Sequence, residues 1–104
     1  MNSTPSTSGF QQLIHGEKPV VVDFFAEWCG PCKMMKPILE QFKQRIGDRA
    51  RVIKIDVDRN PSAANAYGVR SVPTLVIFKN GAVVWRKAGV VSAEQLSAAL
   101  EPFL

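Results

Sequence analysis

A continuous apolar run at residues 20–26 (VVVDFFA) constrains the fold more than any other segment of this chain. The run follows Pro19 and is rich in β-branched and aromatic residues, which favour a β-strand. Because its apolar side chains point to both faces, such a strand must be covered on both sides, as in α/β proteins. One carboxylate, Asp23, interrupts the run, and the only two cysteines, Cys29 and Cys32, follow a few residues later.

Amphipathic helices are expected on either side of this strand. The first begins with Ser8 as its N-cap and stops at Gly16. The second follows the cysteines and ends at Gly47, and its apolar face carries Met35, Ile38, Leu39, Phe42 and Ile46. Pro37 lies inside the second helix, where it removes a backbone donor and crowds the preceding turn, so we expect a kink there.

Two shorter helices are expected later in the chain. Asn60 is a suitable N-cap and Pro61 a suitable first residue for a helix that ends near Tyr67. Ser92, with Gln95 three residues on, forms the capping box of a final helix, whose apolar residues are Leu96, Ala99 and Leu100.

Three more segments have the composition of strands, at residues 51–57, 74–78 and 82–87. The last two flank Asn80-Gly81, a typical hairpin turn. Because the first three strands of the chain are linked through helices, we expect a mostly parallel sheet with an antiparallel edge and helices on both faces.

Length and composition indicate one globular domain over residues 1–104, with 46% hydrophobic residues available for a core. Residues 1–8 are polar and rich in Ser and Thr, so we expect a loose arm or a weak edge strand there. The 13 Lys and Arg exceed the 9 Asp and Glu, but they are scattered and most aromatics fall in the apolar pattern. We therefore expect surface charge rather than a nucleic-acid site.

The chain has no apolar stretch near the roughly 18 residues that would span a bilayer. Its N-terminus also lacks the basic and apolar regions of a secretory signal. We expect a cytoplasmic protein without membrane contact, although a removed presequence would leave no trace in the sequence.

The cysteines are spaced C-x-x-C between a buried strand and a helix, which favours a redox pair. A structural disulfide is a weaker interpretation because the closed loop is too short to stabilise the fold much. Zinc is weaker still, because a structural site normally takes four ligands and the chain adds only His15, expected on a surface helix. We therefore expect no metal.

The two cysteines are expected to have different roles. Cys29 lies at or just before the first turn, where free N–H groups and the helix dipole stabilise a thiolate, so it would be the exposed nucleophile. Cys32, one turn deeper on the same face, would be the shielded thiol that resolves a mixed disulfide. Gly30 leaves room for a partner to approach, and Pro31 suits an early helical position.

Asp23 is the expected base for this chemistry. Burial among valines and phenylalanines should raise its pKa toward the range useful for proton transfer, within reach of Cys32 directly or through one water. The alternative is a carboxylate that only caps a nearby amide. Lys54, in the next strand, could pair with Asp23 and tune its titration, or extend its stem toward the edge of the sheet.

The sequence resembles the thioredoxin family from about Phe10 to Leu100. The resemblance rests on VDFFAEWCGPCK at residues 22–33, KIDVDRNP at 54–61, YGVRSVPTLVIFKNG at 67–81, and Gly89. It implies the thioredoxin fold, an α/β architecture with a central mixed sheet of four to five strands flanked by four helices. Phe25 and Ser71 stand where many members carry tryptophan and glycine.

The resemblance also implies a function. It describes a dithiol–disulfide oxidoreductase that reduces protein disulfides, binds no cofactor, and is reset by thioredoxin reductase at the expense of NADPH. Separately, we expect a monomer. It makes Cys29 the nucleophile, Cys32 the resolving thiol, Asp23 the base and Lys54 its partner. It further implies a cis Val72–Pro73 bond facing the cysteines, and a docking surface formed by Trp28, Gly30, Pro31, Val72, Pro73, Gly89 and Val90.

Two alternative functions stay open at this point. The same surface could serve a binding module that supports another enzyme as a subunit. Within redox chemistry, the pair could instead donate or isomerise disulfides, for which it would have to be more oxidising. The Gly-Pro dipeptide between the cysteines resembles the reducing members.

Overall fold

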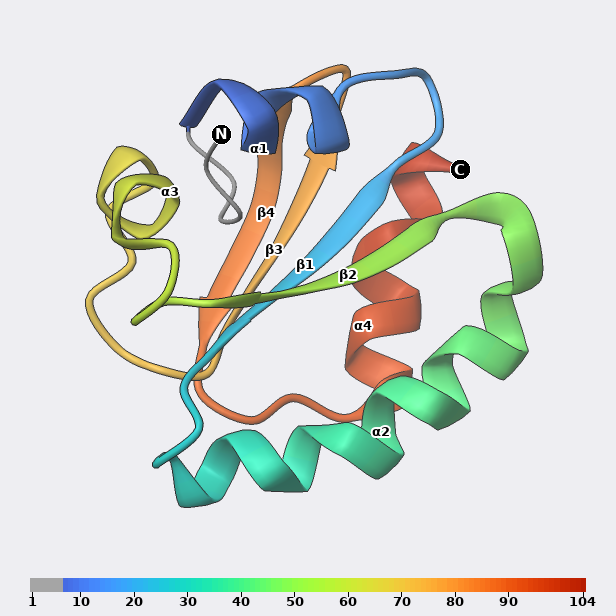
Figure 1. Cartoon of the computed structure of the whole chain (residues 1–104). Coiled ribbons are helices and arrows are strands. Elements are labelled where there is room, and N and C mark those ends of the chain that lie inside the picture. The colour runs from blue at the N-terminus through green and yellow to red at the C-terminus, as the bar shows by residue number, and fades with distance from the viewer. Residues whose placement is uncertain (1–6) are drawn as a thin grey trace.

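The structure is a computed structural model that describes residues 7–104. Along the chain, the elements are α1 (Thr7–Ile14), β1 (Val20–Phe25), α2 (Gly30–Ile46), η1 (Gly47–Arg49), β2 (Arg51–Asp56), α3 (Pro61–Ala66), β3 (Thr74–Lys79), β4 (Ala82–Ala88), α4 (Ala93–Leu100) and η2 (Glu101–Phe103), where η marks a 3-10 helix. Figure 1 shows the sheet between its helices. The expected order of helices and strands is confirmed.

The strands of the described residues form one mixed sheet in the order β2-β1-β3-β4. Only β1 and β2 are parallel, because β3 runs antiparallel to both β1 and β4. The expectation of a mostly parallel sheet is therefore wrong. The connection between β2 and β3, residues 57–73, holds one short helix, α3, and does not carry the chain back to the edge where β1 and β2 begin. The chain consequently re-enters the sheet at the end of β1, where Thr74 pairs with Phe24.

Both faces of the sheet are covered, as the apolar run of β1 requires. Helices α1 and α3 lie on one face, and α2 and α4 lie on the other (Figure 1). Alternate residues of β1 divide between the two cores. Val20, Val22 and Phe24 pack with Phe10 on the α1 side, whereas Val21 packs with Met35 and Leu96 on the α2 side.

The N-terminal boundaries differ slightly from expectation. Helix α1 already includes Thr7, so Ser8 lies inside the helix and is not its N-cap. The arm or weak edge strand expected at residues 1–8 therefore does not extend to residues 7 and 8, and residues 1–6 lie outside the described part of the chain. Helix α2 continues through Pro37 as one element, and a kink there stays a prediction.

The capping box and the hairpin turn form as expected, whereas the predicted side-chain cap at Asn60 does not. Ser92 and Gln95 make both hydrogen bonds of the capping box at α4. Asn80 and Gly81 both have positive φ between β3 and β4, as a type I′ hairpin turn requires. Asn60 precedes α3, but its side chain accepts no helix N–H. Instead its Nδ2 donates to the carbonyl oxygen of Asp56 at 3.0 Å, which ties the helix start back to β2.

Several basic side chains that look scattered in the sequence have a common structural role. Arg49, Arg51 and Arg86 donate to carbonyl oxygens at or beside the ends of α2, α1 and α3. Lys79 donates to the carbonyl of Phe103 at 2.8 Å. Because the last carbonyls of a helix lack intrahelical partners and carry partial negative charge, these contacts stabilise the helix ends.

Candidate redox site

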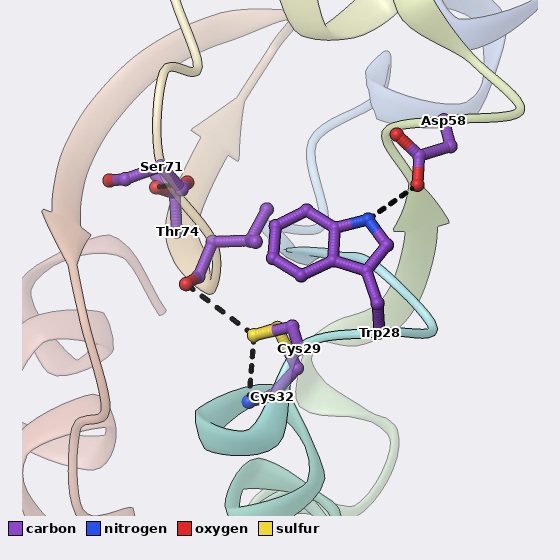
Figure 2. Close-up of a disulfide and its surroundings, with 7 residues drawn as sticks. Trp28, Cys29, Cys32, Asp58, Ser71 and Thr74 are labelled. Carbon is purple, nitrogen blue, oxygen red and sulfur yellow. Dashed lines mark hydrogen bonds between the residues drawn. A yellow bond between two sulfur atoms is a disulfide. The ribbon is translucent and has the colours of Figure 1, made fainter.

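The two cysteines form a disulfide where β1 leads into α2, with their Cα atoms 5.3 Å apart. Cys29 is the N-cap residue of α2, as expected. Its Sγ accepts a hydrogen bond from the backbone N–H of Cys32 at 3.1 Å (Figure 2). A negative charge on this sulfur would be stabilised by that N–H and by the positive end of the helix dipole.

The expected contrast in exposure between the cysteines is not found. Cys29 is only 3% exposed and Cys32 6%, so the prediction of an exposed Cys29 is wrong for the disulfide form. The reason is the apolar surroundings, because Phe25, Val57 and Val72 pack against the pair. The exposed side chain next to the pair is Trp28, at 72%.

The loop before β3 faces the disulfide. The Val72–Pro73 bond is cis, as expected, and the carbonyl oxygen of Val72 lies 3.5 Å from Cys29 Sγ. The sulfur of a disulfide has no proton to donate, whereas the thiol of reduced Cys29 could donate to this oxygen. The N–H of Gly89 donates to the carbonyl oxygen of Pro73 at 2.8 Å, so the start of β3 is tied to the end of β4.

A second hydrogen bond steadies the same loop. The hydroxyl of Thr74 donates to the carbonyl oxygen of Ser71 at 2.7 Å (Figure 2). The loop therefore presents the backbone of Val72 beside the disulfide while contacts on both sides hold it.

Trp28 is oriented by a residue that the sequence reasoning missed. Its ring Nε1 donates to Asp58 Oδ2 at 2.8 Å, and Figure 2 shows the indole beside the disulfide with this nitrogen turned toward Asp58. Asp58 follows β2, and the parallel strands β1 and β2 end at the same edge of the sheet. An acidic residue just after the second strand was the signal that could have identified this partner.

Asp23 is fully buried, and neither carboxylate oxygen has a hydrogen-bond partner among the described residues. The alternation of β1 places it on the face that α2 covers. Burial raises its pKa from the ordinary 3.8 to about 6, and the positive charge of Lys54 opposes part of this rise. These observations disfavour the interpretation in which Asp23 only caps an amide.

Lys54 was expected either to pair with Asp23 or to extend toward the edge of the sheet, and it shows part of both arrangements. It is the register partner of Asp23 in the parallel pair β1–β2, close enough to lower the pKa of that carboxyl. Its side chain nevertheless reaches the surface, where Nζ lies 4.5 Å from the centroid of the Phe25 ring. The ammonium group therefore makes a cation–π contact, and no ion pair with Asp23 forms within residues 7–104.

Two pockets flank the disulfide and share no residue. One, of about 130 Å³, is lined by Phe25, Ala26, Glu27, Cys32, Lys33, Lys36 and Lys54. The other, of about 140 Å³, is lined by Trp28, Val57, Val69, Arg70, Ser71 and Val72. A molecule that approaches the disulfide would therefore meet a lysine-rich pocket and a mainly apolar one.

The other predicted docking residues are arranged as follows. Gly30, Pro31 and Val90 are exposed, whereas Pro73 is buried. Gly89 has a φ of +96°, a backbone conformation that favours glycine. His15 follows the end of α1 instead of lying within it, and its exposed ring lies over Gly81 of the hairpin.

The side chains of residues 7–104 offer no cluster suited to a metal ion, since no three His, Cys, Asp or Glu are grouped so that they could hold one. No helix in the same range is long and apolar enough to cross a membrane.

A buried cysteine pair at a helix start, opposite a cis-proline loop on a mixed sheet, defines the class of thiol–disulfide oxidoreductases built on the thioredoxin fold. The thioredoxin family model matches residues 2–102, so the chain belongs to the thioredoxin family. Like other members, it is a dithiol–disulfide oxidoreductase whose redox centre is a disulfide of the chain itself.

Individual relatives agree with this assignment. A thioredoxin from Alicyclobacillus acidocaldarius is 46% identical over 101 residues, which cover 97% of this chain and 96% of the relative. Chloroplastic thioredoxin Y from Oryza sativa is 45% identical over 93% of this chain and 58% of its own length. The crystal structure of thioredoxin from Malassezia sympodialis has a TM-score of 0.84 and 37% identity, and the match covers 96% of this chain and 88% of that one.

Proposed function

We propose that this protein reduces disulfides of client proteins through a mixed-disulfide intermediate and is itself reset by thioredoxin reductase, with NADPH as the final electron source. The observation that best supports this proposal is the position of Cys29 at the N-cap of α2, with its sulfur accepting the N–H of Cys32. Such a position stabilises the thiolate, which is the form that attacks a disulfide.

In the first step, the thiolate of Cys29 attacks one sulfur of the client disulfide. The client S–S bond breaks as the bond between Cys29 Sγ and the client sulfur forms. The second client sulfur leaves as a thiolate and takes a proton from solvent. No net oxidation has occurred, because one disulfide has replaced another.

In the second step, Cys32 releases the client. Asp23 accepts the thiol proton of Cys32, and the new thiolate attacks Cys29 Sγ. The bond to the client breaks, its sulfur leaves as a thiolate and is protonated, and the Cys29–Cys32 disulfide forms. The client has gained two electrons from the protein. A carboxyl with a pKa of about 6 is ionised at neutral pH and still basic enough to assist this transfer.

Client docking is assigned to the surface around the disulfide. An extended client segment would pair with the backbone of Val72, in the manner of strand addition. Trp28, Gly30, Pro31, Gly89 and Val90 would contact the client around it, whereas buried Pro73 would support the loop from below. Lys54 would tune the proton affinity of Asp23. We further assign this reaction to a monomer in the cytoplasm.

The direct test is to trap the intermediate. The Cys32→Ser variant should retain a disulfide-containing client as a covalent adduct of Cys29, whereas Cys29→Ser should retain none. Release of the adduct by dithiothreitol, followed on a non-reducing gel and by mass spectrometry, checks the assignment. Wild-type protein with thioredoxin reductase and NADPH should turn over repeatedly. Adducts on Cys32 alone would reverse the assigned roles.

The same variants separate the competing function of a binding module. A module that acts without redox chemistry should keep its partner when both cysteines are replaced by serine. Loss of NADPH-dependent client reduction in this double variant, with no retained partner complex, is the result expected for a reductase.

A further inference from the structure

The pocket on the Cys32 side of the disulfide contains two lysines, Lys33 and Lys36, that the redox steps do not use. Lys33, Lys36 and Lys54 line it, and Glu27 is its one acidic residue. Three ammonium groups against one carboxylate leave an excess of two positive charges. Cys32 forms part of the wall, so a group in this pocket lies next to the reacting pair.

The cations of this pocket are partly preorganised. The Lys54 ammonium is held over the ring of Phe25, itself a lining residue, at 4.5 Å from the centroid. Lys33 and Lys36 are three residues apart in α2 and therefore lie on one face of the helix. Both belong to the N-terminal half of α2, and the positive end of its dipole adds to the same potential.

Asp23 is buried and interacts electrostatically with Lys54, and the two carboxylates at and just after the end of β2 have other partners. Asp58 accepts the hydrogen bond of Trp28, and Asp56 pairs with Arg59 at 3.7 Å, the one ion pair among residues 7–104. None of the three pocket lysines takes part in it. The pocket therefore presents cations beside an aromatic ring and a cysteine, a combination that suits the carboxylate of an acidic side chain.

We propose that this pocket is a subsite for an aspartate or glutamate that flanks the reactive disulfide of the client protein. The proposal rests on the proposed function, which brings the client to Cys29. One carboxylate bound by solvent-exposed lysines is held weakly on its own. Once the client is attached at Cys29 or paired with the backbone of Val72, the local concentration of its carboxylate at the pocket is high. The lysine charges then contribute to selection between clients.

The test uses two disulfide peptides that differ only in charge, one with Glu and one with Gln at the positions flanking a cysteine. At low ionic strength, wild type should reduce the Glu peptide about fivefold faster in kcat/KM than the Gln peptide. Lys36→Gln should lower this preference to about twofold, and Lys36→Glu should abolish or invert it. The preference should also decrease in 0.5 M salt, where screening is stronger. The matched control is Lys43→Gln, an exposed lysine of the same helix away from the pocket.

Three results would overturn the subsite. These are equal rates for the two peptides in wild type, an equal effect of Lys43→Gln and Lys36→Gln, and a Glu preference that salt leaves unchanged. Failure to reduce either peptide would instead count against the proposed function. In that case, copies of both peptides with serine in place of cysteine still test the pocket. The acidic copy should shift the NMR signals of Lys33 and Lys36 more than the neutral one, and equal shifts would contradict the proposal.

Discussion

Asp23 and Lys54 are register partners in the parallel strands β1 and β2, yet the lysine ammonium lies over the ring of Phe25. The strand pairing brings a cation near the buried carboxylate, and the aromatic contact gives that cation another partner. Burial consequently has the larger effect on Asp23, whose pKa rises to about 6 despite the opposing influence of Lys54. The pKa of Asp23, the proton acceptor assigned to Cys32, thus depends on where the Lys54 ammonium lies between the carboxylate and the Phe25 ring.

Replacing Phe25 should therefore change the titration of Asp23 through Lys54. In Phe25→Leu the ammonium loses its aromatic partner and can approach the carboxylate, so the pKa of Asp23 should fall. Phe25→Trp, which keeps a cation–π surface, should leave it nearly unchanged. NMR titration of the Asp23 carboxyl carbon measures the change.

A Lys54→Met background distinguishes this route from a change in burial. Lys54→Met alone should raise the pKa of Asp23, because the opposing positive charge is gone. Adding Phe25→Leu should then have little further effect. If Phe25→Leu lowers the pKa of Asp23 equally with and without Lys54, the ring acts through packing. The proposal that it acts by holding the Lys54 ammonium is then wrong.

The stability of the oxidised protein should fall as pH rises from about 4 to above 6. Asp23 has a higher pKa folded than unfolded, so the folded state binds its proton more tightly and is favoured in acid. A rise from 3.8 to about 6 corresponds to a loss of about 3 kcal/mol in the free energy of unfolding across this range. Asp23→Asn should lose this part of the pH dependence. Urea unfolding of both proteins at several pH values checks it, and parallel curves would contradict the assigned pKa.

Asp23→Asn should also slow only the second chemical step. Without the carboxylate, Cys32 must lose its proton to solvent, so decay of the mixed disulfide at neutral pH should slow by about tenfold or more. Formation of the adduct at Cys29 should keep its rate. Rapid-quench mass spectrometry resolves the two steps, and equal slowing of both would assign Asp23 to the environment of Cys29 instead.

Arg86 should contribute to stability through the loop that leads toward Val72. Its guanidinium donates to the carbonyl oxygens of Tyr67 and Gly68, just beyond α3. Because the contact is exposed, Arg86→Gln should lower the free energy of unfolding by about 1 kcal/mol. The neighbouring exposed Lys87, changed to Gln, removes the same charge as a control and should have a smaller effect. Equal losses would indicate a general charge effect.

Much of the fold could be predicted because its signals are local. The hairpin at Asn80-Gly81 and the capping box at Ser92 depend on a few adjacent residues, and both form as expected. The direction of β3 depends instead on where the chain travels after β2, which the sequence pattern does not specify. The chain between β2 and β3 does not return to the edge where β1 begins, so β3 runs antiparallel to β1.

The candidate site shows the same division between local and distant signals. The position of Cys29 at a helix start follows from the residues around it and was predicted. The low exposure of Cys29 and the Trp28–Asp58 hydrogen bond depend on segments remote in sequence, and they were not. The contact of Lys54 with Phe25 is a choice between rotamers of a long side chain, which strand register alone does not determine.

The most direct measurement of the central claim is the reduction potential of the Cys29–Cys32 pair, by equilibration in defined thiol–disulfide buffers and counting of free thiols. A protein-disulfide reductase should give a strongly reducing value. The established value for thioredoxin is about −270 mV, and we expect a result close to it. A value near those of disulfide isomerases or donors, about −180 to −120 mV, would contradict the proposed direction of electron flow.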